Sequence, residues 1–111
     1  EYKFMKWCDI TPTVSEWGSE EIVIPYISPV DGKRHRYFPD FYVKIANKKY
    51  LVEVKPFKQT KEPKTQKRVT KKYINEVVTW SVNQAKWKAA TEFCVDNGWE
   101  FMLITEKELK V

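Results

Sequence analysis

Two carboxylates and a lysine in the middle of the chain have the types and spacing of a metal-dependent hydrolytic site. Asp40 follows Pro39 inside an aromatic stretch, and Glu53 interrupts an apolar stretch two residues before Lys55. A carboxylate in such a setting is costly to bury unless a cation compensates its charge. Two neighbouring carboxylates repel each other, and Mg²⁺ relieves that repulsion because it prefers carboxylate oxygens and retains several waters. The pattern therefore predicts a Mg²⁺ site at Asp40 and Glu53.

Paired strands are expected to bring these three side chains together. Residues 36–45 and 49–55 have strand composition and are separated by a tight turn. Pairing across that turn puts Asp40 and Glu53 near the same level, and side chains at i and i+2 place Glu53 and Lys55 on one face. Lys55 can then contact the attacking water or the developing negative charge. The alternative is that both carboxylates lie on a solvated face of the sheet with Lys55 as a passing cation.

The N-terminal half is expected to form a helix followed by a meander of three antiparallel strands. Residues 1–9 repeat apolar side chains at helical spacing, and the chain has no initiator Met, so we expect this helix to be truncated at its start. Residues 10–20 carry Pro, Thr, Ser and Gly and are expected to form a loop. Residues 21–26 are β-rich and should form the first strand, ahead of strands 36–45 and 49–55.

Two helices are expected after the third strand. Val69 to Trp80 place apolar side chains at helical spacing, which predicts the first helix. Asn83 is a suitable N-cap for a second helix, and Gly98 is its expected stop.

A fourth strand and a short helix should complete the fold. Residues 99–104 are strand-forming, and a right-handed crossover should lay them parallel to the third strand. Thr105 and Glu108 have the spacing of a capping box for a final helix. The predicted fold class is α/β, a small mixed sheet flanked by helices, in a single domain over residues 1–111.

Composition excludes several classes of protein. The chain has 111 residues, of which 42% are hydrophobic and 15% aromatic, which is enough to bury a core and excludes a wholly disordered chain. No apolar run approaches the roughly 20 residues of a membrane-spanning helix, so no membrane partner is expected. Cys8 and Cys94 are far apart and form no CxxC pair, which predicts reduced core thiols of a cytosolic protein.

Positive charge is concentrated in one segment. Residues 57–72 contain seven basic side chains and one acidic one, a net charge of +6 in a chain whose total is +5. Such a cluster favours a polyanionic partner, while a solvated loop that maintains solubility is the alternative. The side chains expected to contact DNA phosphates are Lys33, Arg34, Arg36, Lys58, Lys61, Lys64, Lys67, Arg68, Lys71, Lys72 and Lys86.

The motif resembles that of the PD-(D/E)xK nuclease superfamily, because Pro39-Asp40 is followed by Glu53-x-Lys55 on a strand meander. The resemblance implies a restriction-endonuclease-like core with the order αβββαβ. Longer stretches resemble the head-completion nucleases of T-even-type phages, which are similar to TnsA-type endonucleases. These stretches are WGSEEIVIPY, GKRHRYFPDFYVK, EVKP, NEVVTWSVNQAKWKAA and EFMLITEKEL.

This resemblance implies an endonuclease that cleaves double-stranded or branched DNA during phage head completion. Mg²⁺, or Mn²⁺ in its place, is expected to be held by Asp40, Glu53 and the backbone carbonyl of Val54. The resemblance adds Glu1, on the first helix, to the metal site. Lys55 is expected to orient or deprotonate the attacking water. The resemblance also implies head or neck proteins as partners and a location in the host cytoplasm or on the virion. Cutting both strands in one event would favour a homodimer.

A rival hypothesis is a non-catalytic DNA-binding structural protein of the phage head with a vestigial nuclease core. The presence of Asp40, Glu53 and Lys55 together argues against it, because a degenerate core is expected to lose at least one of them. An RNA-binding module is a third possibility, but the strands lack the paired aromatic side chains of an RNP motif.

Overall fold

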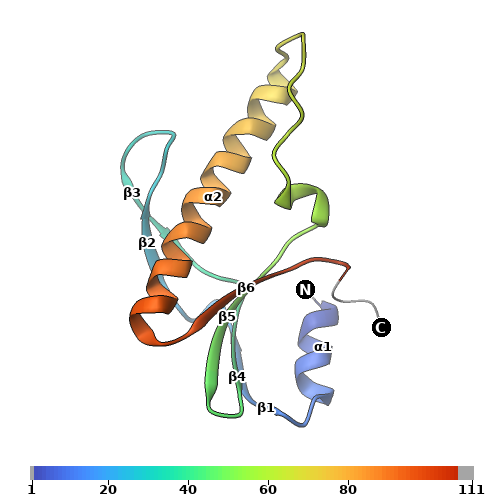
Figure 1. Cartoon of the computed structure of the whole chain (residues 1–111), viewed down its shortest axis with the longest axis vertical. Helices are drawn as coiled ribbons and strands as arrows, with labels where there is room; N and C mark the ends of the chain where they lie inside the picture. Colours follow the sequence, from blue (N-terminus) through green and yellow to red (C-terminus); the bar gives the residue numbers. More distant parts are fainter. Residues whose placement is uncertain (1, 108–111) are drawn as a thin grey trace.

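A four-stranded mixed sheet forms the centre of the computed structural model, which describes residues 2–107 (Figure 1). The elements in chain order are α1 (Tyr2–Ile10), β1 (Val14–Ser19), β2 (Ile24–Ile27), β3 (Arg34–Tyr37), β4 (Phe41–Ile45), β5 (Lys48–Val54), the 3₁₀ helix η1 (Phe57–Thr60), α2 (Lys71–Asn97) and β6 (Glu100–Ile104).

The central sheet has the strand order β1-β4-β5-β6, and β2 and β3 form a separate two-stranded ribbon. β4 is antiparallel to both β1 and β5, whereas β6 is parallel to β5, as the strand–helix–strand crossover predicts. Omitting the ribbon, the order of elements is α1, β1, β4, β5, α2, β6. This is the αβββαβ arrangement of the restriction-endonuclease-like α/β class, with the β2–β3 ribbon inserted between the first two strands of the core.

The two helices cover opposite faces of the sheet (Figure 1). On one face Phe4 and Cys8 of α1 pack with Val52 of β5 and the inward side chains of β4. On the other, Trp87 of α2 packs with Leu51 of β5 and the ribbon. Leu51 and Val52 therefore point to opposite cores, because successive side chains of a strand alternate between its faces.

The strand predictions were partly wrong. Residues 10–20 were expected to be a loop, but β1 lies within them as an edge strand paired with β4. Residues 36–45 form two strands, since Pro39 has no N–H to donate and restricts the residue before it. The chain turns at that break from the ribbon into the central sheet. The expected three-strand meander is therefore wrong as a single sheet, because its two hairpins, β2–β3 and β4–β5, belong to different sheets.

The prediction of two helices over 69–94 was also wrong, because α2 runs without interruption. Asn83 lies inside it and is buried rather than acting as a cap. The buried positions Asn83, Trp87, Ala90 and Cys94 continue at spacings of three and four, so packing overrides the local capping preference of Asn. The N-cap is Thr70, whose hydroxyl accepts a hydrogen bond from the Tyr73 N–H, and Gly98 ends the helix with φ 71° as predicted.

Three smaller expectations concern the cysteines, membrane-spanning helices and the end of the chain. Cys8 and Cys94 are buried free thiols in different clusters, as expected. No helix described here combines the length and apolar composition needed to cross a membrane. The final helix after Thr105 was predicted over residues that lie largely outside the described part of the chain.

Candidate active site

The strand pairing places the two carboxylates opposite each other. Phe41 pairs with Val52 at the end of the β4–β5 hairpin; Asp40 precedes Phe41 and Glu53 follows Val52, so continuing this register puts Asp40 opposite Glu53. The backbone of Asp40 is fixed on its other side, where its carbonyl accepts a hydrogen bond from the N–H of Glu20 at 3.1 Å. The hairpin therefore brings together residues that are 13 positions apart in the sequence.

Glu53 is a buried carboxylate with compensating partners. The residue is only 3% exposed, and its Oε1 accepts a hydrogen bond from the hydroxyl of Tyr37 at 2.6 Å. The ammonium of Lys55 lies 3.1 Å from Oε2. A charged donor and a neutral donor thus occupy the two oxygens, which is how a buried carboxylate remains tolerable. The side chain is not on a solvated face of the sheet.

Asp40 is oriented toward the same strand. Its Oδ2 accepts a hydrogen bond from the backbone N–H of Val54 at 2.9 Å, so its carboxylate lies against the peptide that follows Glu53. Both charges reach Tyr37: burial raises the pKa of that hydroxyl, and the hydrogen bond and charge of Glu53 followed by the charge of Asp40 raise it further. The Tyr37 hydroxyl is therefore in direct contact with Glu53 and within the electrostatic influence of Asp40.

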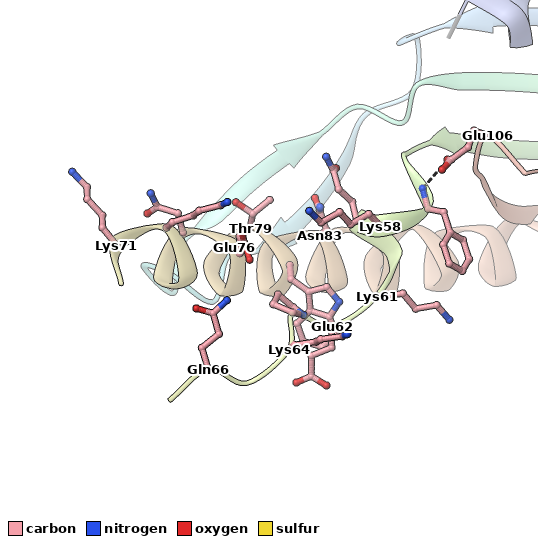
Figure 2. A pocket seen from close by; sticks show the side chains of 16 residues that line it. Lys58, Lys61, Glu62, Lys64, Gln66, Lys71, Glu76, Thr79, Asn83 and Glu106 are labelled. Atoms are coloured by element: carbon pink, nitrogen blue, oxygen red, sulfur yellow. Dashed lines mark hydrogen bonds between the residues drawn. The ribbon is translucent and has the colours of Figure 1, made fainter. Parts of the chain in front are cut away.

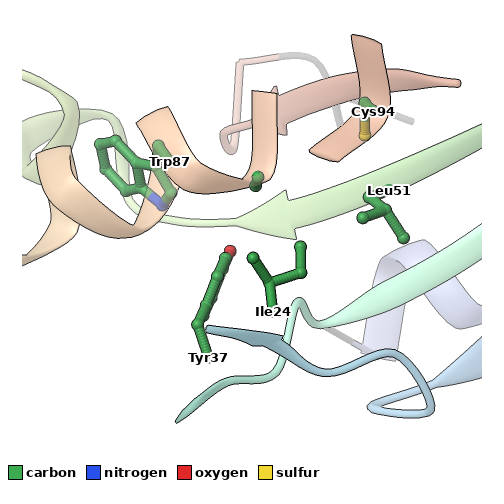
Figure 3. Close-up of a cluster of buried hydrophobic side chains, with 6 residues drawn as sticks. Ile24, Tyr37, Leu51, Trp87 and Cys94 are labelled. Carbon is green, nitrogen blue, oxygen red and sulfur yellow. The ribbon is translucent and has the colours of Figure 1, made fainter. Parts of the chain in front are cut away.

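Tyr37 is a residue of this site that the sequence argument missed. It is 4% exposed and packs with Ile24 and Trp87 between the ribbon and α2 (Figure 3). A tyrosine three residues before Asp40, at the start of an expected strand, has the ordinary composition of a sheet. The sequence signal that could have identified Tyr37 was its hydroxyl, because a buried tyrosine hydroxyl usually requires a hydrogen-bond partner.

The side chains predicted to hold a metal are partly assembled. Asp40, Glu53 and Val54 lie together at the end of the β4–β5 pair. Among residues 2–107 no three His, Cys, Asp or Glu side chains form a cluster that could hold a metal ion. Two carboxylates and a carbonyl nevertheless suit Mg²⁺, which is commonly bound by one or two carboxylates and keeps waters. Glu1, the remaining predicted ligand, lies outside the described residues.

The basic side chains predicted to contact DNA lie in three places. Lys33, Arg34 and Arg36 are exposed on the β2–β3 ribbon and the turn that leads into it. Lys86 lies on α2, and its ammonium is 5.7 Å from the centre of the ring of Tyr37, whose hydroxyl bonds to Glu53. The others extend along the segment after β5 and into the first turn of α2: Lys58, Lys61, Lys64, Lys67, Arg68, Lys71 and Lys72.

Comparisons with known proteins agree with this architecture. Residues 11–106 match the family described as TnsA-like endonuclease N terminal, a range that includes Asp40, Glu53 and Lys55. The head completion nuclease of Enterobacteria phage T4 is 39% identical over 112 residues, which covers 96% of this chain and 75% of that protein. No solved structure matches the chain. Because the match spans nearly all of the central sheet and α2, this chain belongs to the TnsA-like endonuclease family.

Proposed function

We propose that this protein is a divalent-metal-dependent endonuclease that hydrolyses DNA phosphodiester bonds during phage head completion. The observation that supports the proposal is that Asp40, held by the N–H of Val54, and Glu53, with Lys55 3.1 Å away, both lie at the end of the β4–β5 pair. The family match and the name of the phage T4 relative support the same reaction class.

Asp40, Glu53 and the carbonyl of Val54 would hold Mg²⁺, and Mn²⁺ is expected to substitute for it. The bound ion would polarise a phosphoryl oxygen and lower the pKa of a coordinated water. The Val54 N–H fixes Asp40 and the Tyr37 hydroxyl fixes Glu53, so neither carboxylate must be reoriented before it binds an ion. Preorganisation of this kind reduces the cost of assembling the site.

Lys55 has two roles in this proposal. In the structure it compensates the charge of Glu53, and its side chain is partly exposed to solvent. When a divalent ion neutralises Glu53, the same ammonium becomes available to the attacking water or to the negative charge that develops on phosphorus.

DNA is the proposed substrate because exposed lysines and arginines flank α2 on the ribbon and on the segment after β5 (Figure 1). We further propose that the protein acts in the host cytoplasm or on the assembling virion, beside other head or neck proteins. A homodimer would allow both strands to be cut in one event.

The test is the conversion of supercoiled plasmid to nicked or linear DNA by the purified chain. We expect cleavage with Mg²⁺ or Mn²⁺, none with a chelator, and none from Glu53→Gln. Glu16→Gln is the matched control, because it removes the same charge from an exposed position on β1. A chain that binds the plasmid but cuts it with neither metal would instead support the non-catalytic DNA-binding protein.

A further inference from the structure

A groove separates the segment after β5 from the first half of α2 (Figure 2). One wall is formed by residues 57–66 and the other by α2 between Lys71 and Asn83, and the groove has a volume of about 1310 Å³. Lys71 lies toward one end and Glu106 toward the other, with Lys58 and Asn83 between them (Figure 2). The groove therefore runs lengthwise along the helix.

The walls carry more positive than negative charge. Lys58, Lys61, Lys64, Lys71 and Lys72 line the groove against Glu62, Glu76 and Glu106. The carboxylate of Glu106 is already occupied, since it accepts a hydrogen bond from the N–H of Phe57 at 2.8 Å. Lysines on both walls suit one anionic chain lying between them.

The floor has a different chemistry from the walls. Asn83 is 8% exposed and lines the groove with its amide. The indole N–H of Trp80, which lines the same groove, is buried and has no hydrogen-bond partner among the described residues. Buried polar groups are nearly always paired, so this unpaired donor marks a place where a ligand can hydrogen-bond. Thr79 and Trp80 lie four and three residues before Asn83 on α2, about one helical turn away, and line the same groove.

This combination discriminates between forms of DNA. A duplex shows mainly phosphates to the surfaces that flank it, whereas unpaired bases present hydrogen-bonding edges and flat faces. Basic walls above a floor of amide, hydroxyl and indole groups match a single strand, with its phosphates on the lysines and its bases toward Asn83 and Trp80.

We propose that this groove binds a single-stranded segment of DNA, a proposal that rests on the nuclease function above and specifies its substrate as DNA with an unpaired arm. Phe57 lines the groove and follows Lys55 by two residues in the chain, so the segment that forms one wall of the groove continues directly from the strand that carries Glu53 and Lys55.

The test is equilibrium binding of fluorescein-labelled oligo(dT) and of a duplex of equal length, by anisotropy in the presence of a chelator. Trp80→Leu should weaken oligo(dT) binding at least fivefold, the effect of losing one stacked base. Lys61→Gln combined with Lys64→Gln should reduce the slope of log affinity against log salt for oligo(dT) by roughly 1.4. Duplex affinity should fall by a clearly smaller factor than oligo(dT) affinity in both variants.

The matched control is Lys3→Gln combined with Lys6→Gln, which removes two exposed lysines from α1 on the opposite face of the sheet. Equal losses for oligo(dT) and duplex, or an unchanged salt slope in the groove double variant, would overturn the proposal. The lysine variants alter exposed side chains only, so they decide the matter even if Trp80→Leu does not fold. Because the chelator prevents cleavage, failure of this inference is distinguishable from failure of the nuclease function.

Discussion

Replacing Tyr37 with phenylalanine isolates the contact that holds Glu53 in place. The substitution removes one hydroxyl from a side chain that is 4% exposed and leaves the ring in its packing between the ribbon and α2. Glu53 then keeps Lys55 on Oε2 but loses its donor on Oε1. A change in unfolding free energy or in metal affinity therefore reports on the loss of the hydrogen bond rather than on a cavity in the core.

The expected magnitude follows from the burial of both partners. A hydrogen bond to a charged group contributes about 1.5–3 kcal/mol, and here its loss leaves a buried carboxylate oxygen without a donor. A free-energy loss of about 2 kcal/mol corresponds to a fall in Tm on the order of 10 °C in a chain of this size. If Glu53 binds the metal, loss of a group that orients it should weaken metal affinity by roughly 10- to 100-fold.

Urea unfolding measures the first quantity, and calorimetric titration with Mn²⁺ measures the second. Tyr26→Phe is the matched control, because Tyr26 lies on the other strand of the ribbon and also faces Lys86, but does not bond to Glu53. Unchanged unfolding free energy in Tyr37→Phe would refute the hydrogen bond as a stabilising contact. Unchanged Mn²⁺ affinity would refute Tyr37 as a positioning residue for the metal ligand.

Three further predictions follow from other contacts. Lys55→Gln should abolish plasmid cleavage while DNA affinity measured by anisotropy stays within about threefold, since the ammonium acts mainly on the transition state; a proportional loss of binding would make Lys55 a simple phosphate contact. Burial raises the pKa of the Cys8 and Cys94 thiols from 9.0 to about 11, so the unfolded chain loses these protons first. Stability should therefore be full below about pH 9 and decline toward pH 11 in urea titrations, and the double alanine variant should show a smaller decline; equal declines would exclude the thiols as its cause. Gly98→Ala should cost about 1–2 kcal/mol of unfolding free energy because Gly98 has φ 71°, and no loss would mean that the helix ends differently.

Local patterns predicted the parts of the fold that depend on short-range signals. The β4–β5 hairpin, β6 and the end of α2 at Gly98 follow from alternation, helical spacing and a residue suited to positive φ. β1 was missed because it is an edge strand with polar side chains, and only its pairing with β4 makes it a strand. The ribbon was misplaced for a related reason, since nothing local in residues 21–37 says which sheet they join.

The candidate site likewise contains contacts that the local sequence predicts and contacts that it does not. Hairpin register predicts that Asp40 and Glu53 lie opposite each other at the same position along the strand pair. Strand alternation predicts that Glu53 and Lys55 share one face of the sheet. Tyr37 could not be found in this way, because its hydroxyl reaches Glu53 only after the chain turns at Pro39 and the ribbon packs against α2. Contacts between separate sheets depend on tertiary packing, which the spacing of residues does not encode.

The central claim is that Asp40 and Glu53 together hold a divalent cation. Its most direct test is a crystal structure of the protein grown with Mn²⁺, with anomalous scattering used to locate the ion. The account predicts one strong anomalous peak within coordination distance of both carboxylates and of the Val54 carbonyl oxygen, and loss of that peak in Glu53→Gln. No peak between the two carboxylates at saturating Mn²⁺, with their side chains placed as described here, would contradict it.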